Sequence, residues 1–297
     1  MLRISLILGC LFLITSGFQN ANAQDNQSPT WTTQLPTDRG PDASASQAPA
    51  PTPTAPDQPA DDTAAIQQEV GDRDATYLRT RVVFRYDYKD QTGDTTTNRF
   101  RLRVLYAFGP KQRLAMSVLV PVIQKNTPTG SAAGSGDTEV VGGANLFVAE
   151  RFRTGVSFQV TFQTSSDTLI GGATTTIKPA WGFTAVLSRR FQLTGAFYYK
   201  QSIHTVRGTP VKQFEPDITL NTRVLKATWF IEWDSFYDVA PGQLAQTLRT
   251  GLSRGFGSER RWVASADCGF ALNGYGGQTQ YHLNPRLDVT WYPFKNR

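Results

Sequence analysis

The sequence contains few of the residues from which structural metal sites and disulfide frameworks are built. Of its 297 residues, two are cysteines and two are histidines. Cys10 lies near the start of the chain and Cys268 near its end, so the pair supplies neither a disulfide framework nor a zinc site. The sequence therefore predicts no metal site and no other cofactor.

Long hydrophobic runs are absent after the first 23 residues. A membrane-spanning helix needs roughly 18 to 20 consecutive apolar residues, so a helical membrane protein with several spans is excluded. A β-barrel is not excluded, because its strands cross the membrane with alternating rather than continuous apolar residues.

The first 23 residues have the three parts of an export signal. Arg3 supplies positive charge, an apolar stretch runs to Ile14, and Ala21-Asn22-Ala23 is a cleavage site of small residues. A lipoprotein signal ending at Cys10 would leave only six residues after Arg3, which is short for the apolar stretch. We expect a signal peptide at 1–23 that directs the protein out of the cytoplasm.

Residues 24–75 differ sharply from the rest of the chain in composition. They hold nine acidic residues against two arginines, a run of Ala, Pro and Thr from 48 to 56, and very few apolar side chains. Such a segment cannot bury enough apolar surface to fold alone. We predict a disordered acidic periplasmic linker over 24–75, and the alternatives that it binds a partner or folds back onto the basic remainder stay open.

From residue 76 to the end, apolar and polar residues alternate with period two. Leu78, Val82 and Phe84 share one face, for example, and charged residues occupy the other. Twelve such stretches of about 11 to 16 residues follow one another, about twice the usual strand length of a soluble sheet. Short connections alternate with longer Gly- and Thr-rich ones, as in outer-membrane barrels. The prediction is an all-β fold over 76–297, a transmembrane up-and-down antiparallel β-barrel of about 12 strands.

Aromatic residues fit two girdles on the lipid-facing parity of this barrel. If the chain enters from the periplasm, one girdle lies at the periplasmic ends of strands and the other at the external ends. The first comprises Trp229, Trp262 and Trp291; the second comprises Tyr86, Tyr88, Tyr199, Tyr237 and Tyr281.

Several short motifs resemble a known family. Val118-Leu119-Val120-Pro121 precedes a Gly-rich loop ending at Asp137, Val141-Gly142-Gly143 follows, and Asp167 to Gly172 resembles the middle section. The pattern is similar to the bacterial outer-membrane family labelled meta-pathway of phenol degradation, over essentially residues 76–297. The resemblance implies an outer-membrane transporter or channel, located in the cell outer membrane.

Charged residues of opposite sign lie on the inward-facing parity of different strands. The first two predicted strands form a basic wall: Arg79, Arg81, Arg85, Arg99, Arg101 and Arg103. Three later strands form an acidic wall: Asp217, Glu232, Asp234 and Asp267. On opposite sides of a narrow pore, these walls would create a transverse field that orients and selects polar or anionic solutes.

The sequence therefore predicts an outer-membrane channel or transporter that passes small solutes, aromatic or anionic ones among them, through a narrow lumen. The alternative is a structural barrel whose charges pair and seal the interior. An outer-membrane hydrolase fits less well, because neither His204 nor His282 stands in the His-x-Ser arrangement of outer-membrane phospholipases. We predict no catalytic residues. We expect lipid and a small-molecule solute as partners and no nucleic acid. The sequence makes no prediction of the oligomeric state.

Overall fold

The structure is a computed structural model that describes residues 62–71, 73–206, 210–257 and 260–294. The predicted signal peptide and most of the predicted linker lie outside the described residues. None of the helices in the described part of the chain is long and apolar enough to span a membrane.

Long strands make up most of the described chain, as the period-two alternation predicts. Two short helices, α2 (Asp62–Val70) and α3 (Gly274–Thr279), and one 3-10 turn at Pro110–Gln112 accompany them. The strands are β1 (Arg81–Gln91), β2 (Thr95–Phe108), β3 (Leu114–Thr127), β4 (Gly130–Ser135), β5 (Thr138–Val148), β6 (Phe152–Phe162), β7 (Thr174–Val186), β8 (Phe191–Thr205), β9 (Lys212–Val224), β10 (Ala227–Asp238), β11 (Gln243–Phe256), β12 (Trp262–Ala271) and β13 (Leu283–Trp291).

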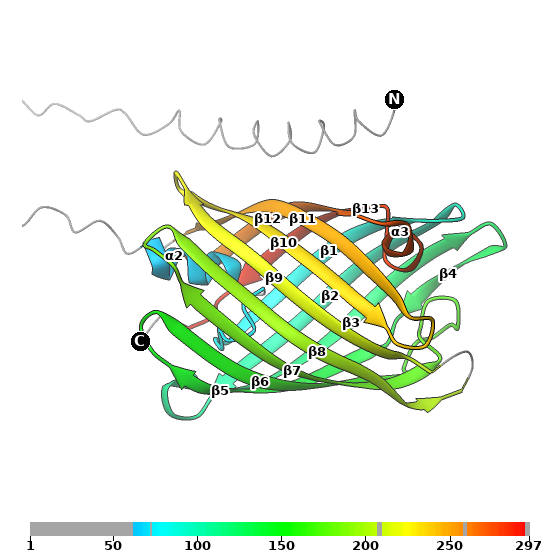
Figure 1. Cartoon of the computed structure of the whole chain (residues 1–297), viewed down its shortest axis with the longest axis horizontal. Helices are drawn as coiled ribbons and strands as arrows, with labels where there is room; N and C mark the ends of the chain where they lie inside the picture. The colour runs from blue at the N-terminus through cyan, green and yellow to red at the C-terminus, as the bar shows by residue number, and fades with distance from the viewer. Residues whose placement is uncertain (1–61, 72, 207–209, 258–259, 295–297) are drawn as a thin grey trace, which may run out of the picture. The chain divides into compact units, whose positions relative to one another are not determined.

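The strands form a closed antiparallel barrel (Figure 1). Apart from β4, each strand pairs with the strands before and after it in the ring, β3 with β5 among them, and β1 pairs with β2 on one side and with β13 on the other. The short strand β4 pairs with β3 alone and stands outside the ring, which leaves twelve strands in the barrel. The prediction of a transmembrane up-and-down barrel of about 12 strands is confirmed.

Two local features differ from the sequence-based expectation. The predicted loop at 126–137 contains β4, which forms a hairpin with the extended end of β3. The last predicted strand began at residue 279, whereas α3 extends to Thr279 and β13 begins only at Leu283. Tyr281, predicted for the external girdle, is therefore buried inside, where its hydroxyl accepts a hydrogen bond from Arg249.

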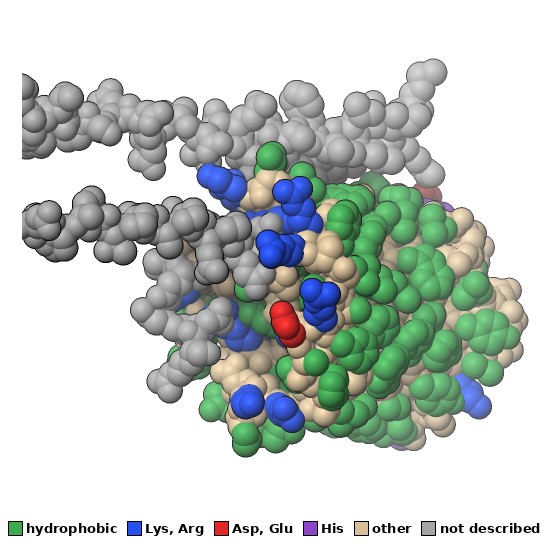
Figure 2. Space-filling view, turned by 60° about the vertical axis from the view of Figure 1, so that its left-hand side comes forward, with side chains coloured by type: hydrophobic (Ala, Val, Ile, Leu, Met, Phe, Trp, Pro, Cys, Tyr) green, Lys and Arg blue, Asp and Glu red, His purple; other side chains and the backbone are tan. Residues whose placement is uncertain are grey.

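Successive side chains along each strand point alternately outward and into the lumen. On β2 the outward Phe100, Leu102 and Val104 are 58%, 42% and 46% exposed, while Arg99, Arg101 and Arg103 point inward. Trp262 and Trp291 stack on the outer face with ring centroids 5.9 Å apart. An apolar outer band over a polar interior is the pattern of a barrel surrounded by lipid. Figure 2 shows hydrophobic side chains covering this outer face.

The two ends of the barrel differ in their connections. One end, here the short-turn end, carries tight turns such as Leu225-Lys226 between β9 and β10. The opposite end, here the long-loop end, carries the hairpin of β4, the 163–173 loop and α3. Helix α2 lies at the short-turn end and α3 at the long-loop end (Figure 1).

The chain before β1 runs inside the short-turn end. Its described residues, 62–71 and 73–80, are called here the N-terminal segment. Helix α2 contacts β8 to β12, and Ile66 and Val70 are buried. We expected a disordered linker up to residue 75, but the structured part begins with α2. The segment has too few apolar residues to fold alone, yet its charged side chains find partners on the lumen face.

Placing a charge on the lipid face tests this arrangement. Leu102 points outward from the middle of β2, so Leu102→Arg should lower the stability of the barrel by about 2–4 kcal/mol. Denaturant unfolding in detergent or lipid, followed by the gel shift between unboiled and boiled protein, measures the change. Ser157→Arg is the matched control, because Ser157 lies mid-strand on β6 and faces the lumen. Equal losses in both variants would contradict the assigned faces.

Candidate functional site

The arginines of the predicted basic wall lie inside the barrel, but carboxylate side chains lie among them and form ion pairs with several of them. Arg85 forms an ion pair with Asp288 on β13, at 2.6 Å between Nε and Oδ1. Asp87 receives the guanidinium groups of both Arg99 and Arg101, at 2.9 and 3.0 Å. These partners come from the adjacent strand in each case, because antiparallel pairing brings inward-facing side chains of neighbouring strands together.

The remaining members of the basic wall lie at different depths. Arg79 donates to the carbonyl oxygen of Phe294 at 2.8 Å and lies over the ring of Tyr292, at the short-turn end. Arg81 donates to the carbonyl oxygen of Tyr77 at 2.8 Å. Arg103, on β2, faces the interior cavity described below.

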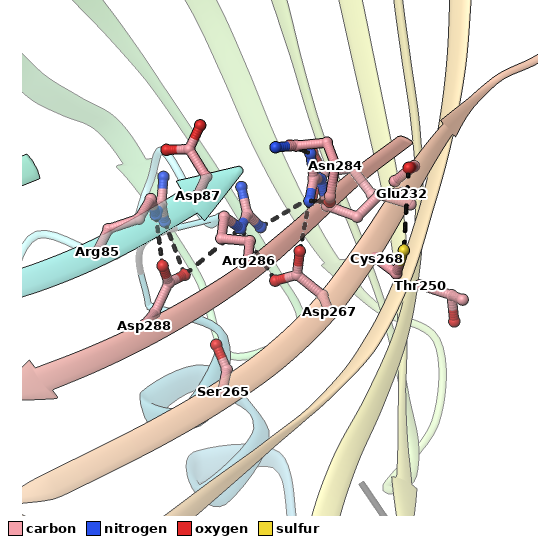
Figure 3. Close-up of polar contacts among 12 residues, drawn as sticks. Arg85, Asp87, Glu232, Thr250, Ser265, Asp267, Cys268, Asn284, Arg286 and Asp288 are labelled. Carbon is pink, nitrogen blue, oxygen red and sulfur yellow. Dashed lines mark hydrogen bonds and ion pairs between the residues drawn. The ribbon is translucent and has the colours of Figure 1, made fainter. Parts of the chain in front are cut away.

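The predicted acidic wall divides into two groups. Asp267 on β12 receives Arg73, at 2.7 Å, Arg286, at 2.9 Å, and Arg249. Glu232 on β10 lies 3.5 Å from Arg73. Figure 3 shows this network continuing through Arg286 to Asp288 and Arg85. Asp267 is therefore part of a mixed cluster beside the basic wall rather than opposite it.

The second acidic group lacks such partners. Asp217 and Asp234 stand opposite each other on β9 and β10, and neither side-chain carboxylate forms a hydrogen bond or ion pair among the residues that the structure describes. Glu215, two residues before Asp217, pairs with Lys178 on β7. The ammonium of Lys178 also lies 4.2 Å from the ring centroid of Tyr198.

Two cavities occupy the lumen between these groups. The inner cavity has a volume of about 380 Å³ and is lined on one side by Arg81, Arg85, Arg101 and Arg103. The outer cavity has a volume of about 390 Å³ and extends to Thr279 and Gln280 beside α3. Lys178, Tyr198 and Asp217 line both, so they mark the passage between the two chambers. Six residues of the two predicted walls line the inner cavity: Arg81, Arg85, Arg101, Arg103, Asp217 and Glu232.

Sequence reasoning missed several charged residues of the lumen. Arg249, Arg286 and Asp288 lie on the inward parity of their strands, so the alternation alone could have identified them. Arg73 could not be found in this way, because it lies in the acidic segment outside any alternating pattern. Burial lowers the pKa of Arg73, and the nearby Arg286 adds to this, while Asp267, Asp288 and Glu232 act in the opposite direction.

Comparison with known proteins supports the fold. No family model and no curated protein matches the sequence, so the resemblance to the phenol-degradation family stays a prediction. The chain is similar in structure to the COG4313 outer membrane channel from Pseudomonas putida F1, with a TM-score of 0.59 and 12% sequence identity over 74% of this chain and 98% of that one. It is also similar to the NanC porin, with a TM-score of 0.52 and 9% identity over 71% and 98% of the two chains.

The mixed cluster around Asp267 should be essential for stability. Asp267→Asn removes the negative charge of the carboxylate that the three buried arginines share. We therefore expect a loss of about 3–5 kcal/mol in the free energy of unfolding. Tryptophan fluorescence in denaturant measures it. The matched control is Asp217→Asn, which removes a lumen carboxylate without an ion-pair partner among the described residues and relieves repulsion from Asp234. A comparable loss in the control would show that the network is not what stabilises the interior.

Proposed function

We propose that the protein is an outer-membrane channel that passes small anionic solutes through its lumen. The observation that carries this proposal is the charge of the inner cavity. Seven basic side chains line it against four acidic ones. The basic members are Arg73, Arg81, Arg85, Arg101, Arg103, Lys178 and Arg286, and the acidic members are Asp74, Glu139, Asp217 and Glu232.

The excess of positive charge favours anions for an electrostatic reason. Low-dielectric walls of a narrow lumen focus the field of the charges that line it, so a net positive lining lowers the barrier for an anion and raises it for a cation. Arg81 and Arg103 present this charge on β1 and β2, across the cavity from Lys178 and Tyr198.

The size of the chambers restricts the solute. Cavities of about 380 and 390 Å³ lie at the lower end of the range that holds small organic molecules. Tyr77 and Tyr198 add aromatic surface to the inner cavity, so carboxylated molecules of monosaccharide size and small aromatic acids are the solute classes that fit. The short-turn end faces the periplasm in this proposal, as in other outer-membrane barrels.

A second candidate function rests on the ion pairs. The contacts of Asp87, Asp267 and Asp288 with arginines also fit a structural barrel with a sealed interior. The two functions differ in what the net positive charge of the inner cavity does, and this difference can be measured. A hydrolase has less support, because the Nε2 atom of His282 hydrogen-bonds the hydroxyl of Thr92 at 2.8 Å rather than that of a serine.

A triple substitution separates the two functions. In the variant Arg81→Gln, Arg101→Gln, Arg103→Gln, the inner cavity loses three of its seven positive charges. We expect the reversal potential of open events in a planar bilayer, under a KCl gradient, to shift from anion toward cation preference. Liposome swelling should show slower entry of glucuronate and unchanged entry of glucose.

The matched control is Arg189→Gln, Arg190→Gln, Lys111→Gln, which removes three positive charges from short turns outside the lumen. Unchanged selectivity in the lumen variant, together with a clear loss of heat resistance, would contradict the channel and support the sealed structural barrel.

A further inference from the structure

The barrel is complete without the N-terminal segment. The pairing of β1 with β13 closes the ring, and among the described residues no strand pairing includes one before Arg81. The segment nevertheless lies inside the short-turn end, where Arg73, Asp74, Ala75 and Tyr77 line the inner cavity. Its described residues therefore narrow the lumen without belonging to the strands of the wall.

We propose that the N-terminal segment is a plug that closes the channel at its short-turn end, and that the channel conducts when the plug leaves its seat. This proposal rests on the proposed channel function. Besides Arg79, which lies next to β1 and contacts Phe294 and Tyr292, three charged side chains hold the plug. These three contact different sets of wall strands.

The first of these side chains is Glu69, at the end of α2. Its carboxylate accepts hydrogen bonds from the guanidinium of Arg223 and from the hydroxyl of Thr228, the latter at 2.7 Å. The backbone N–H of Gly255 donates to its other oxygen at 2.9 Å. One carboxylate thus ties α2 to β9, β10 and β11.

The second is Arg73, whose guanidinium is buried against a group of carboxylates on the wall. It contacts Asp267, Glu232 and Asp288, at 2.7, 3.5 and 3.8 Å. Its guanidinium carbon also lies 3.7 Å from the ring centroid of Phe230. These contacts place the centre of the plug on β10, β12 and β13.

The third is Asp74, which points to the other side of the lumen. It accepts from the hydroxyl of Thr184 on β7 at 2.6 Å and from Arg153 on β6 at 3.3 Å. It also accepts from the backbone N–H and hydroxyl of Thr76. Because Arg73 and Asp74 are neighbours in sequence, two successive side chains bridge opposite parts of the barrel.

The wall is shaped to receive this segment. A Cβ atom at Gly182, on β7, would lie 3.0 Å from the Cβ atom of Ala75. A Cβ atom at Gly71 would lie 2.3 Å from the hydroxyl oxygen of Tyr292. The hydroxyl of Tyr292 in turn donates to the carbonyl oxygen of Gln68 at 2.8 Å. The plug therefore packs closely as well as pairing its charges.

The contacts also explain how the plug can leave without unfolding the wall. Asp267 keeps Arg249 and Arg286 as partners when Arg73 departs, and Asp288 keeps Arg85. A buried charge that keeps a partner of opposite sign avoids most of the cost of an uncompensated charge. The backbone ladders of the barrel are unaffected, because the plug contacts the wall mainly through side chains.

A disulfide between plug and wall provides the test. The hydroxyl oxygens of Thr76 and Thr184 are 2.8 Å apart, close enough for cysteines at both positions to join with little movement. The full-length variant Thr76→Cys, Thr184→Cys is made with Cys268→Ala and recorded in planar bilayers before and after reduction. We expect the open probability of the oxidised form to be at most about one tenth of that of the reduced form. Reduction should restore it fully.

The matched control places the disulfide within the wall. Thr194→Cys, Thr219→Cys joins paired residues of β8 and β9 and leaves the plug free, so its open probability should not depend on oxidation. Equal conduction of the oxidised and reduced plug variant, with the disulfide verified by mass spectrometry, would overturn the plug while leaving the channel in place.

A second variant releases the plug without a disulfide. Gly182→Val with Asp74→Asn removes the space for Ala75 and one of the three charges. Release is read by limited trypsin cleavage after Arg73, whose side chain is only 6% exposed in its seat. We expect faster cleavage and a higher open probability than in the unsubstituted protein. Unchanged cleavage would overturn the seat assigned to the plug, and fast cleavage with no conduction would overturn the channel function instead.

Discussion

Closure of the β1–β13 seam is the constraint on which the remaining structure depends. A strand surrounded by lipid has no water to satisfy the N–H and C=O groups of an open edge, so a membrane sheet must close on itself. Closure fixes one face of every strand outward and the other inward. The outward face is apolar, and the inward face carries many charged residues in an enclosed space where each must find a partner or meet solute.

Much of the fold follows from the alternation in the sequence. Period two in stretches such as 97–108 identifies the strands, and their even number and alternating connections identify the barrel. The same parity places Arg101 and Asp267 in the lumen. It does not show which charges meet, because the partners of Asp267 come from β11, β13 and the N-terminal segment. The register between neighbouring strands, rather than the amino-acid composition, places Asp267 among the arginines.

The N-terminal segment shows why amino-acid composition alone does not locate the start of the ordered chain. Residues before 76 are too polar to form a core, and a polar segment is ordinarily solvated. Here the barrel supplies the buried environment and the polar partners, so Glu69 and Asp74 hold fixed positions against Thr228 and Thr184 of the wall. Similarly, the position of Tyr281 depends on α3, a turn of helix that has no apolar periodicity to reveal it.

The ion pair between Arg85 and Asp288 has a consequence for assembly. It joins the first and last strands of the barrel, and Asp87 stands opposite Arg286 across the same seam. These strands are far apart in sequence and meet only when the sheet curls round to complete the ring. A slip of one residue along the seam would turn one member of each pair toward the acyl chains, at a high energetic cost. The charges therefore favour the correct alignment of the closing strands over a register shifted by one residue.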